Sequence, residues 1–308
     1  MNTKLESLFK SLKINYTTHN LTVVSSILFS AQHHYREFKI PKRKGGFRKI
    51  TTPYPTLHLL QARIKSKFFD DFKIHTKAYA FENGKNAIEH ARLHCGSKEL
   101  LTLDINDFFS NIKRDKVFSI FYELGIDSDL AKQLSYLCTL DGALPQGACT
   151  SPKLSNAIFH HLDCRLEKLA QSFSLEYSRY ADDLAFSGEK VPKRFIGIVD
   201  KILSDGNFKL NVGKTKLKVE GSKKIITGVS ISSGKVKAPK SFKRELRAQI
   251  FELEKNKDNL YEMPNFDPLI YEKTLGKINY LLQVEPNNEY AKNKRKIILN
   301  NYKELLRR

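Results

Sequence analysis

The chain has 308 residues, which is enough for one large domain or for two or three subdomains. Its formal net charge of +20 favours a polyanionic partner, usually nucleic acid, although solvated lysines on a soluble basic protein are the alternative. No stretch is apolar enough to predict a membrane span, and the first residues lack the apolar core of a signal peptide. The four cysteines have no CxxC spacing, so we expect reduced thiols in a cytoplasmic protein.

The first half of the chain alternates helical and strand patterns. Apolar residues at helical spacing predict helices within 1–35, and a basic turn containing two glycines joins two short strands between 38 and 53. The next predicted elements are a helix over 55–74, an apolar strand over 100–105, and helices over 115–140 and 150–172.

The second half begins with strands on either side of Asp182 and Asp183. A helix follows, then candidate strands, then a basic helical tail interrupted by prolines: 192–207, 209–219, 224–231 and 241–308, with Pro264 and Pro286. The order strand, helix, strand pair, helix, strand is that of a split βαβ unit. We therefore expect an α+β fold with helices on one face of an antiparallel sheet, and a subdomain boundary near residue 232 that leaves 233–308 as a basic helical domain.

Three carboxylates are candidates for one site. Asp104 ends the strand pattern LLTLD, and Asp182 and Asp183 lie in RYADDLAF 78 residues later. If the two segments are neighbouring strands and the doublet sits in a tight hairpin, all three side chains meet at one sheet edge. An ordinary hairpin turn is the alternative. Clustered carboxylates need a counter-charge, and two Mg²⁺ ions about 3.5–4 Å apart supply one while activating a hydroxyl and stabilising a leaving pyrophosphate.

Five segments in register resemble those of reverse transcriptases over roughly residues 35–232. They are the basic turn KRKGGFRK at 42–49, the box DINDFF at 104–109, LPQGACTSP at 144–152, YADD at 180–183 and NVGKT at 211–215. The resemblance implies a right-hand polymerase fold with fingers, a split βαβ palm and a helical thumb at 233–308. It also implies RNA-directed DNA polymerase activity by two-metal nucleotidyl transfer.

The resemblance implies a role for each matching residue. Two Mg²⁺ ions would be held by Asp104, Asp182 and Asp183, with the carbonyl of Ile105 as a further ligand. Arg48 would grip the phosphates of the incoming dNTP, together with Lys42 or Lys44, between which the sequence does not choose. Phe109 would exclude a ribose 2′-hydroxyl, leaving Phe108 for the core. Gln146 would contact the nucleotide or the template beside it. Lys214 would lie near the phosphates.

Each of these roles has a plainer alternative: a solvated turn lysine at Lys44, core packing for Phe109, a turn before a helix at Gln146, and a surface position for Lys214. Cys149 is expected to be a small packing residue rather than a nucleophile.

Two further segments resemble motifs of the retron reverse transcriptases. Asn86, Ala87 and His90 match NAxxH, and Ile226, Thr227 and Gly228 match VTG with isoleucine in place of valine. The resemblance assigns both segments to RNA binding. An N-cap asparagine and a buried helix histidine are the alternative for NAxxH. His90 and His94 are spaced for a metal, but the sequence offers no third ligand.

A retron enzyme implies a dedicated noncoding RNA that serves as primer and template. DNA synthesis would start from a 2′-hydroxyl of that RNA and give a branched RNA–DNA product, the msDNA. About 76 residues follow residue 232, so we expect host RNase H to remove the template. A separate effector protein and an antiphage role are also implied. The alternatives are a group II intron-like or diversity-generating reverse transcriptase, and an RNA-binding scaffold without catalysis.

Overall fold

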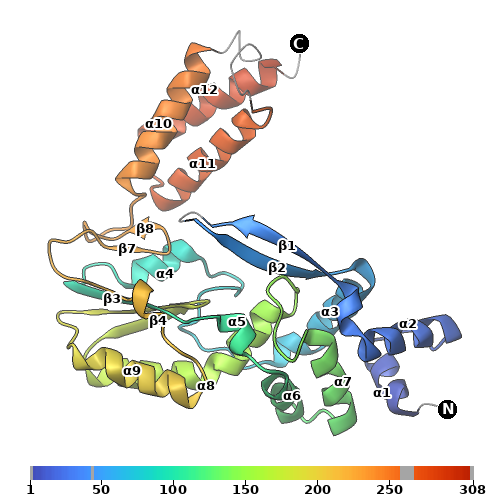
Figure 1. Ribbon diagram of the computed structural model, residues 1–308. Coiled ribbons are helices and arrows are strands. Elements are labelled where there is room, and N and C mark those ends of the chain that lie inside the picture. The colour runs from blue at the N-terminus through green and yellow to red at the C-terminus, as the bar shows by residue number, and fades with distance from the viewer. Residues whose placement is uncertain (1–2, 43–44, 257–266, 306–308) are drawn as a thin grey trace. The chain divides into compact units, whose positions relative to one another are not determined.

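The computed structural model describes residues 3–42, 45–256 and 267–305, and its chain divides into two compact units. Unit 1 comprises residues 1–85, 101–186 and 190–217, and unit 2 comprises 86–100, 187–189 and 218–308. Figure 1 shows the elements of both. Among the described residues, no helix is both long and apolar enough to cross a bilayer.

Unit 1 begins with two helices rather than a continuous one. These are α1 (Thr3–Ser11) and α2 (Thr18–Phe29), followed by the 3₁₀ turn η1 (Ala31–His34). The break within the predicted helical region 1–35 has a local cause, because the Thr17 hydroxyl caps α2 by accepting a hydrogen bond from the backbone N–H of Asn20 at 3.2 Å.

A long two-stranded ribbon follows. Strand β1 (Tyr35–Pro41) pairs antiparallel with β2 (Phe47–Pro53) along its whole length. Helix α3 (Pro55–Phe68) starts directly afterwards with proline in its first turn, and η2 (Phe69–Asp71) ends it. The predicted pair of strands at 38–53 and the helix at 55–74 are confirmed, with the helix ending earlier than expected.

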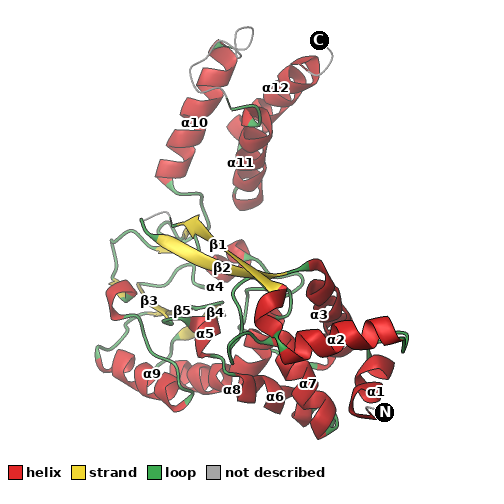
Figure 2. Cartoon of the chain, turned by 45° about the vertical axis from the view of Figure 1, so that its right-hand side comes forward, coloured by secondary structure: helices red, strands yellow, loops and turns green. Residues whose placement is uncertain are grey.

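The four-stranded sheet confirms the α+β prediction. Its strands are β3 (Glu99–Asp104), β4 (Glu176–Tyr180), β5 (Asp183–Gly188) and β6 (Lys216–Lys218), in the spatial order β4-β5-β3-β6. Helix α8 (Ser151–Ser172) precedes β4 and α9 (Arg194–Asp205) follows β5. Figures 1 and 2 show both helices on the same side of the sheet, as a split βαβ unit requires.

The segment between β3 and α8 forms three short helices, α5 (Phe108–Asn111), α6 (Arg114–Glu123) and α7 (Ser128–Cys138). The single helical stretch predicted over 115–140 is wrong at its middle. Gly125 adopts φ +78° there, and the Asp127 carboxylate caps α7 by accepting from the N–H of Asp129 at 2.9 Å. The predicted strand at 209–219 is also mostly wrong, because η3 (Val212–Lys214) interrupts it and leaves only β6.

One continuous apolar core fills unit 1. It runs from the N-terminal helices through α3, α6 and α7 to the face of the sheet that α8 and α9 cover, and it contains Phe108, Phe159 and Phe208 in mutual ring contact. Burial of this core on one side of the sheet leaves the ends of β3, β4 and β5 as a rigid support for polar side chains.

Unit 2 contains α4 (Ala87–Leu93), the small hairpin β7 (Ile225–Ile226) and β8 (Val229–Ser230), and three basic helices. These helices are α10 (Lys240–Lys255), α11 (Ile270–Val284) and α12 (Glu289–Leu305). Pro286 lies between α11 and α12 as predicted, and Pro264 lies outside the described residues. The strand predicted over 224–231 is a hairpin because its middle residues, Thr227 and Gly228, both have positive φ.

Candidate active site

The acidic doublet sits at the hairpin between β4 and β5. The turn consists of Ala181 and Asp182, and Ala181 adopts the left-handed conformation with φ +56°. Asp183 is the first residue of β5 and its side chain is exposed. A regular strand places adjacent side chains on opposite faces, so the turn is what allows both carboxylates to reach the same edge.

Backbone hydrogen bonds bring Asp104 to this turn. The N–H of Ile105 donates to the carbonyl of Asp182 at 2.9 Å, and the N–H of Asn211 donates to the carbonyl of Asp104 at 2.8 Å. The side chain of Asp104 is 9% exposed. The end of β3 is therefore fixed between the acidic turn and the segment before β6. As a result, Asp104 lies at the same sheet edge as Asp182 and Asp183, although 78 residues separate it from Asp182.

Lys214 neutralises Asp104 in the structure. Its Nζ lies 2.9 Å from each carboxylate oxygen of Asp104, and this hydrogen bond raises the pKa of the ammonium. The lysine side chain is otherwise largely exposed. It reaches the acidic edge because η3 turns the chain back just before β6.

The carboxyl groups of the doublet are harder to ionise than in water. Loss of solvation, followed by repulsion from Asp182 and Asp104, raises the pKa of Asp183 to about 6. Loss of solvation and the charge of Asp104 also raise the pKa of Asp182, against the opposing charges of Lys214 and Arg48. The environment thus disfavours ionisation of Asp182 and Asp183, and a bound cation would favour it.

The donors fit a hard divalent cation, since carboxylate oxygens and the Ile105 carbonyl are the ligands that such ions prefer. In the described part of the chain, no three His, Cys, Asp or Glu side chains are already arranged around one ion position. Lys214 occupies both oxygens of Asp104, the most buried of the three carboxylates.

A buried ion pair holds the β4–β5 turn in place. Arg179 and Asp163 are both fully buried and joined by two hydrogen bonds of 2.8 and 2.7 Å, and the Tyr177 hydroxyl donates to the same carboxylate at 2.7 Å. Arg179 Nη1 also donates to the carbonyl of Ala181 at 3.1 Å and to Oδ1 of Asn156 at 3.0 Å. The guanidinium therefore ties the acidic turn to helix α8.

Sequence reasoning missed this network. The available signal that a buried partner existed was Arg179 itself, an arginine within a predicted strand, three positions before the doublet. Nothing in the spacing identifies Asp163 as that partner.

A cleft of about 830 Å³ opens in front of Asp104 and Asp182, and Asp183 is not among the residues that line it. It brings together most of the residues assigned to catalysis and nucleotide binding: Arg48, Asp104, Ile105, Phe109, Gln146, Asp182 and Lys214. Arg48 is exposed on β2, where its charge acts on Asp182. Lys42 also lines the cleft, whereas Lys44 lies outside the described residues.

The turn that carries Gln146 is held against β2. The N–H of Thr51 donates to the carbonyl of Gln146 at 2.9 Å, and Gly147 has φ +139°. A Cβ at Gly147 would stand 2.7 Å from the Thr51 carbonyl oxygen, so only glycine allows this approach. The neighbouring Cys149 is half-buried, and burial raises the pKa of its thiol, which fits a packing residue.

The two phenylalanines after Asp104 have different environments. Phe108 is buried in the core, and Phe109 is half-buried at the wall of the cleft. Both rings line the cleft, and Phe109 also packs against the core. Core packing of Phe108 is as expected, and the contact of Phe109 with a nucleotide stays a prediction.

The two segments predicted to bind RNA meet in unit 2. Asn86 caps α4 by accepting from the N–H groups of Ile88 and Glu89 at 2.9 and 3.0 Å. The Thr227 hydroxyl donates to the carbonyl of Ala87 at 3.0 Å and lies 3.3 Å from Nδ1 of His90.

The residues of these two segments differ in solvent exposure. Asn86 and Gly228 are exposed, but His90 is fully buried and Ile226 is 4% exposed. Burial, followed by the charge of His94, lowers the pKa of His90 to about 3. Their roles in RNA binding remain a prediction, with Asn86 and Gly228 on the surface and the other two inside.

The chain is similar to known proteins over most of its length. The reverse transcriptase (RNA-dependent DNA polymerase) family matches residues 40–260. The retron Ec86 reverse transcriptase of Escherichia coli is 30% identical over 250 residues, covering 80% of this chain and 77% of that enzyme.

Two relatives from Myxococcus xanthus are longer. The retron Mx65 reverse transcriptase is 32% identical over 220 residues, covering 65% of this chain and 52% of that enzyme. The retron Mx162 reverse transcriptase is 30% identical over 259 residues, covering 73% and 53%. This chain spans about half the length of these two relatives. The chain belongs to the reverse transcriptase family, of the bacterial retron type, and its four-stranded sheet with α8 and α9 is the palm of a right-hand polymerase fold.

Proposed function

We propose that this chain copies part of a dedicated structured RNA into DNA by two-metal nucleotidyl transfer. The observation that carries the proposal is the meeting of Asp104, Asp182 and Asp183 at one sheet edge, at the cleft that Arg48 and Phe109 line. The raised pKa values of Asp182 and Asp183 support it, because carboxylates that lose solvation and repel one another gain from a bound cation.

The metal ligands in this proposal are the three carboxylates and the Ile105 carbonyl. Two bound Mg²⁺ ions would neutralise the cluster, activate the primer hydroxyl and stabilise the leaving pyrophosphate. Arg48 binds the phosphates of the dNTP from β2, and Lys42 or Lys44 assists it. Lys214 moves from Asp104 toward the phosphates, since its side chain is mostly exposed and only its ammonium is engaged.

Positioning accounts for the rest of the proposed catalysis. Phe109 lies against the sugar and excludes a 2′-hydroxyl. Gln146 contacts the nucleotide or the template base beside it. The hydrogen bond from Thr51 on β2 holds the turn that carries Gln146 in position for this contact. Arg179 keeps the acidic turn in place through the Ala181 carbonyl.

The RNA partner follows from the retron relatives and from the meeting of the two motifs in unit 2. We propose that Asn86, Ala87, Thr227 and Gly228 form the RNA-contacting surface, while His90 and Ile226 hold it from inside. The noncoding RNA serves as primer and template, and synthesis starts from one of its 2′-hydroxyls to give msDNA. The proposal includes host RNase H, a separate effector protein and an antiphage role in the cytoplasm.

The test is to purify the chain from cells that carry its gene with the flanking sequence, and to sequence the copurifying nucleic acid. The proposal predicts one structured RNA joined to DNA through a 2′ linkage, and the Asp182→Asn variant should retain the RNA without DNA. A diverse set of RNAs, or RNA without DNA in the unsubstituted chain, would contradict it and favour another reverse transcriptase or a scaffold.

A further inference from the structure

Lys214 stands where a cation bound to Asp104 would stand. Its Nζ lies 2.9 Å from Oδ1 and 2.9 Å from Oδ2, so the ammonium engages both oxygens of the carboxylate at once. Asp104 is also one of the proposed metal ligands, and it lies at the same sheet edge as Asp182 and Asp183. The lysine and a metal ion therefore need the same oxygens.

The two partners of this ion pair differ in how firmly they are held. Asp104 ends a strand of the palm sheet, its carbonyl accepts from the N–H of Asn211 at 2.8 Å, and its side chain is 9% exposed. Lys214 lies on η3, in which no residue is buried, and its own side chain is 60% exposed. A segment with few buried apolar contacts moves at low cost, so Lys214 can leave while Asp104 stays in place.

Two lysines that line the cleft are engaged away from Asp104. Lys49 pairs with Glu37 on the neighbouring strand at 2.6 Å, and Lys113 donates to the carbonyl of Ser110 at 2.8 Å. Neither contact involves the acidic edge, whereas the ammonium of Lys214 is directed at it.

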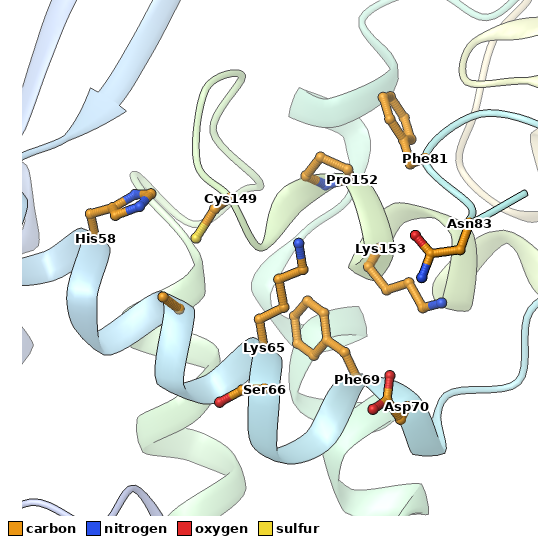
Figure 3. Close-up of a pocket in the computed structure, with 11 residues that line it drawn as sticks. His58, Lys65, Ser66, Phe69, Asp70, Phe81, Asn83, Cys149, Pro152 and Lys153 are labelled. Atoms are coloured by element: carbon orange, nitrogen blue, oxygen red, sulfur yellow. The ribbon is translucent and has the colours of Figure 1, made fainter. Parts of the chain in front are cut away.

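The lysines beside the cleft are also directed elsewhere. A second cavity, of about 620 Å³, shares Phe81 with the cleft, and Lys65 and Lys153 line it (Figure 3). Lys153 donates to Glu82 at 2.8 Å, and Figure 3 shows the Lys65 ammonium pointing toward the segment that carries Cys149. These two lysines do not line the cleft and leave Asp104 to Lys214.

A divalent cation and Lys214 compete for Asp104. Magnesium binds a carboxylate oxygen at about 2.1 Å, and a second cation on the same carboxylate repels it. A triphosphate in the cleft offers the ammonium other acceptors, because the three N–H groups of a lysine can donate to phosphate oxygens. The exposed side chain allows this change of partner.

We propose that Lys214 holds the place of a metal ion on Asp104 until the triphosphate of an incoming nucleotide draws the ammonium away, so that metal and nucleotide bind as a linked pair. Such linkage is reciprocal, and each ligand raises the affinity for the other by the same factor. The inference rests on the proposed polymerase function, since it concerns the metal and nucleotide of that reaction.

The test measures binding of Mn²⁺, whose electron paramagnetic resonance signal reports the free ion, in the absence of nucleotide and RNA. The variant is Lys214→Gln, which removes the ammonium from Asp104. Lys216→Gln is the matched control, because Lys216 is exposed on β6 and its charge acts on Asp183, but it does not line the cleft. Thermal melting checks that each variant is folded.

Lys214→Gln should bind Mn²⁺ at least about five-fold more tightly than the unsubstituted chain, since one charge-assisted hydrogen bond no longer competes. Lys216→Gln should change the affinity by about two-fold or less. Lys214→Arg keeps a cation that can engage both oxygens and should match the unsubstituted chain. Adding Asp104→Asn to Lys214→Gln should remove the gain.

A second measurement adds a saturating dNTP analogue with a methylene group between its α and β phosphates, which cannot be incorporated. The analogue itself chelates Mn²⁺ equally in all samples, so a difference between variants reports Lys214. It should raise the Mn²⁺ affinity of the unsubstituted chain by a larger factor than that of Lys214→Gln. Equal factors would contradict the linkage.

Equal Mn²⁺ affinity of the unsubstituted chain and Lys214→Gln would overturn the inference. An equal gain for Lys216→Gln would do the same, because it would show that net charge alone decides the affinity. A separate primer extension assay with Mg²⁺ and dNTPs tests the proposed function. Failure of the unsubstituted chain to make DNA, while Lys214→Gln still gains Mn²⁺ affinity through Asp104, would contradict the polymerase function and leave the role of Lys214 supported.

Discussion

At the scale of single residues, the site depends on carboxyl groups whose ionisation is less favourable in the protein than in water. Asp183 has its pKa raised to about 6 and Asp182 has a raised pKa, while Lys214 engages only Asp104. A cation that binds all three removes both the repulsion and the solvation deficit at once. Relief of this repulsion would contribute to the proposed binding of Mg²⁺.

Phe109 gives a prediction that isolates sugar selection. Phe109→Ala removes the ring from the wall of the cleft, so discrimination against ribonucleotides should fall by roughly ten-fold or more. The measurement is the ratio of kcat/KM for a dNTP to that for the matching ribonucleotide. Phe195→Leu is the control, because Phe195 is fully buried in the core and does not line the cleft, so it should change stability but leave the ratio as it was.

At the scale of secondary-structure elements, the buried pair of Arg179 and Asp163 joins the β4–β5 turn to helix α8. Arg179→Ala leaves the buried Asp163 carboxylate without its counter-charge, with only the Tyr177 hydroxyl still donating to it, and should lower the free energy of unfolding by about 3–5 kcal/mol. Arg165→Ala, which removes a half-exposed ion pair with Asp205 from the same helix, should cost less than about 1 kcal/mol. Urea unfolding measures both, and equal costs would show that the buried pair does not support the turn.

The contact between α4 and the β7–β8 hairpin gives a prediction about pH. His90 has a pKa of about 3 in the folded protein, against about 6.5 when unfolded, so below pH 6.5 the unfolded state takes up a proton that the folded state refuses. Stability should therefore fall by about 2 kcal/mol between pH 7 and pH 5 from this residue alone.

The comparison is between urea unfolding of the unsubstituted chain and of His90→Gln across that range. The variant should show a shallower decline, and His19→Gln, at an exposed histidine, should keep the original slope. Parallel curves for the unsubstituted chain and His90→Gln would contradict the buried, neutral His90.

The sequence predicted those parts of the site that lie within short motifs. The YADD turn, the end of β3 and the LPQG turn could be located because each joins a recognisable pattern to an element boundary. The pairs Arg179 with Asp163 and Lys214 with Asp104 could not, since they join segments 16 and 110 residues apart whose side chains meet only in three dimensions. His90 was predicted as an RNA contact, but helical spacing alone does not tell which face of α4 is buried.

At the scale of the whole molecule, charge dominates. The net charge is +20, and residues 191–308 alone carry +13. Neutralising several phosphates releases counterions, so affinity for RNA should fall at least about 100-fold between 50 and 200 mM salt. A salt series with one structured RNA measures the slope of log affinity against log salt, and a slope near zero would show that the basic surface is not used for binding.

The most direct test of the account is DNA synthesis by the purified chain on a primed RNA template with dNTPs and Mg²⁺. The unsubstituted chain and Asp115→Asn, an exposed acidic residue on α6, should extend the primer. Asp104→Asn and Asp182→Asn should each lose at least about 100-fold in rate while melting at a similar temperature. Extension by either of these two variants at the rate of the unsubstituted chain would show that the three carboxylates are not the catalytic centre.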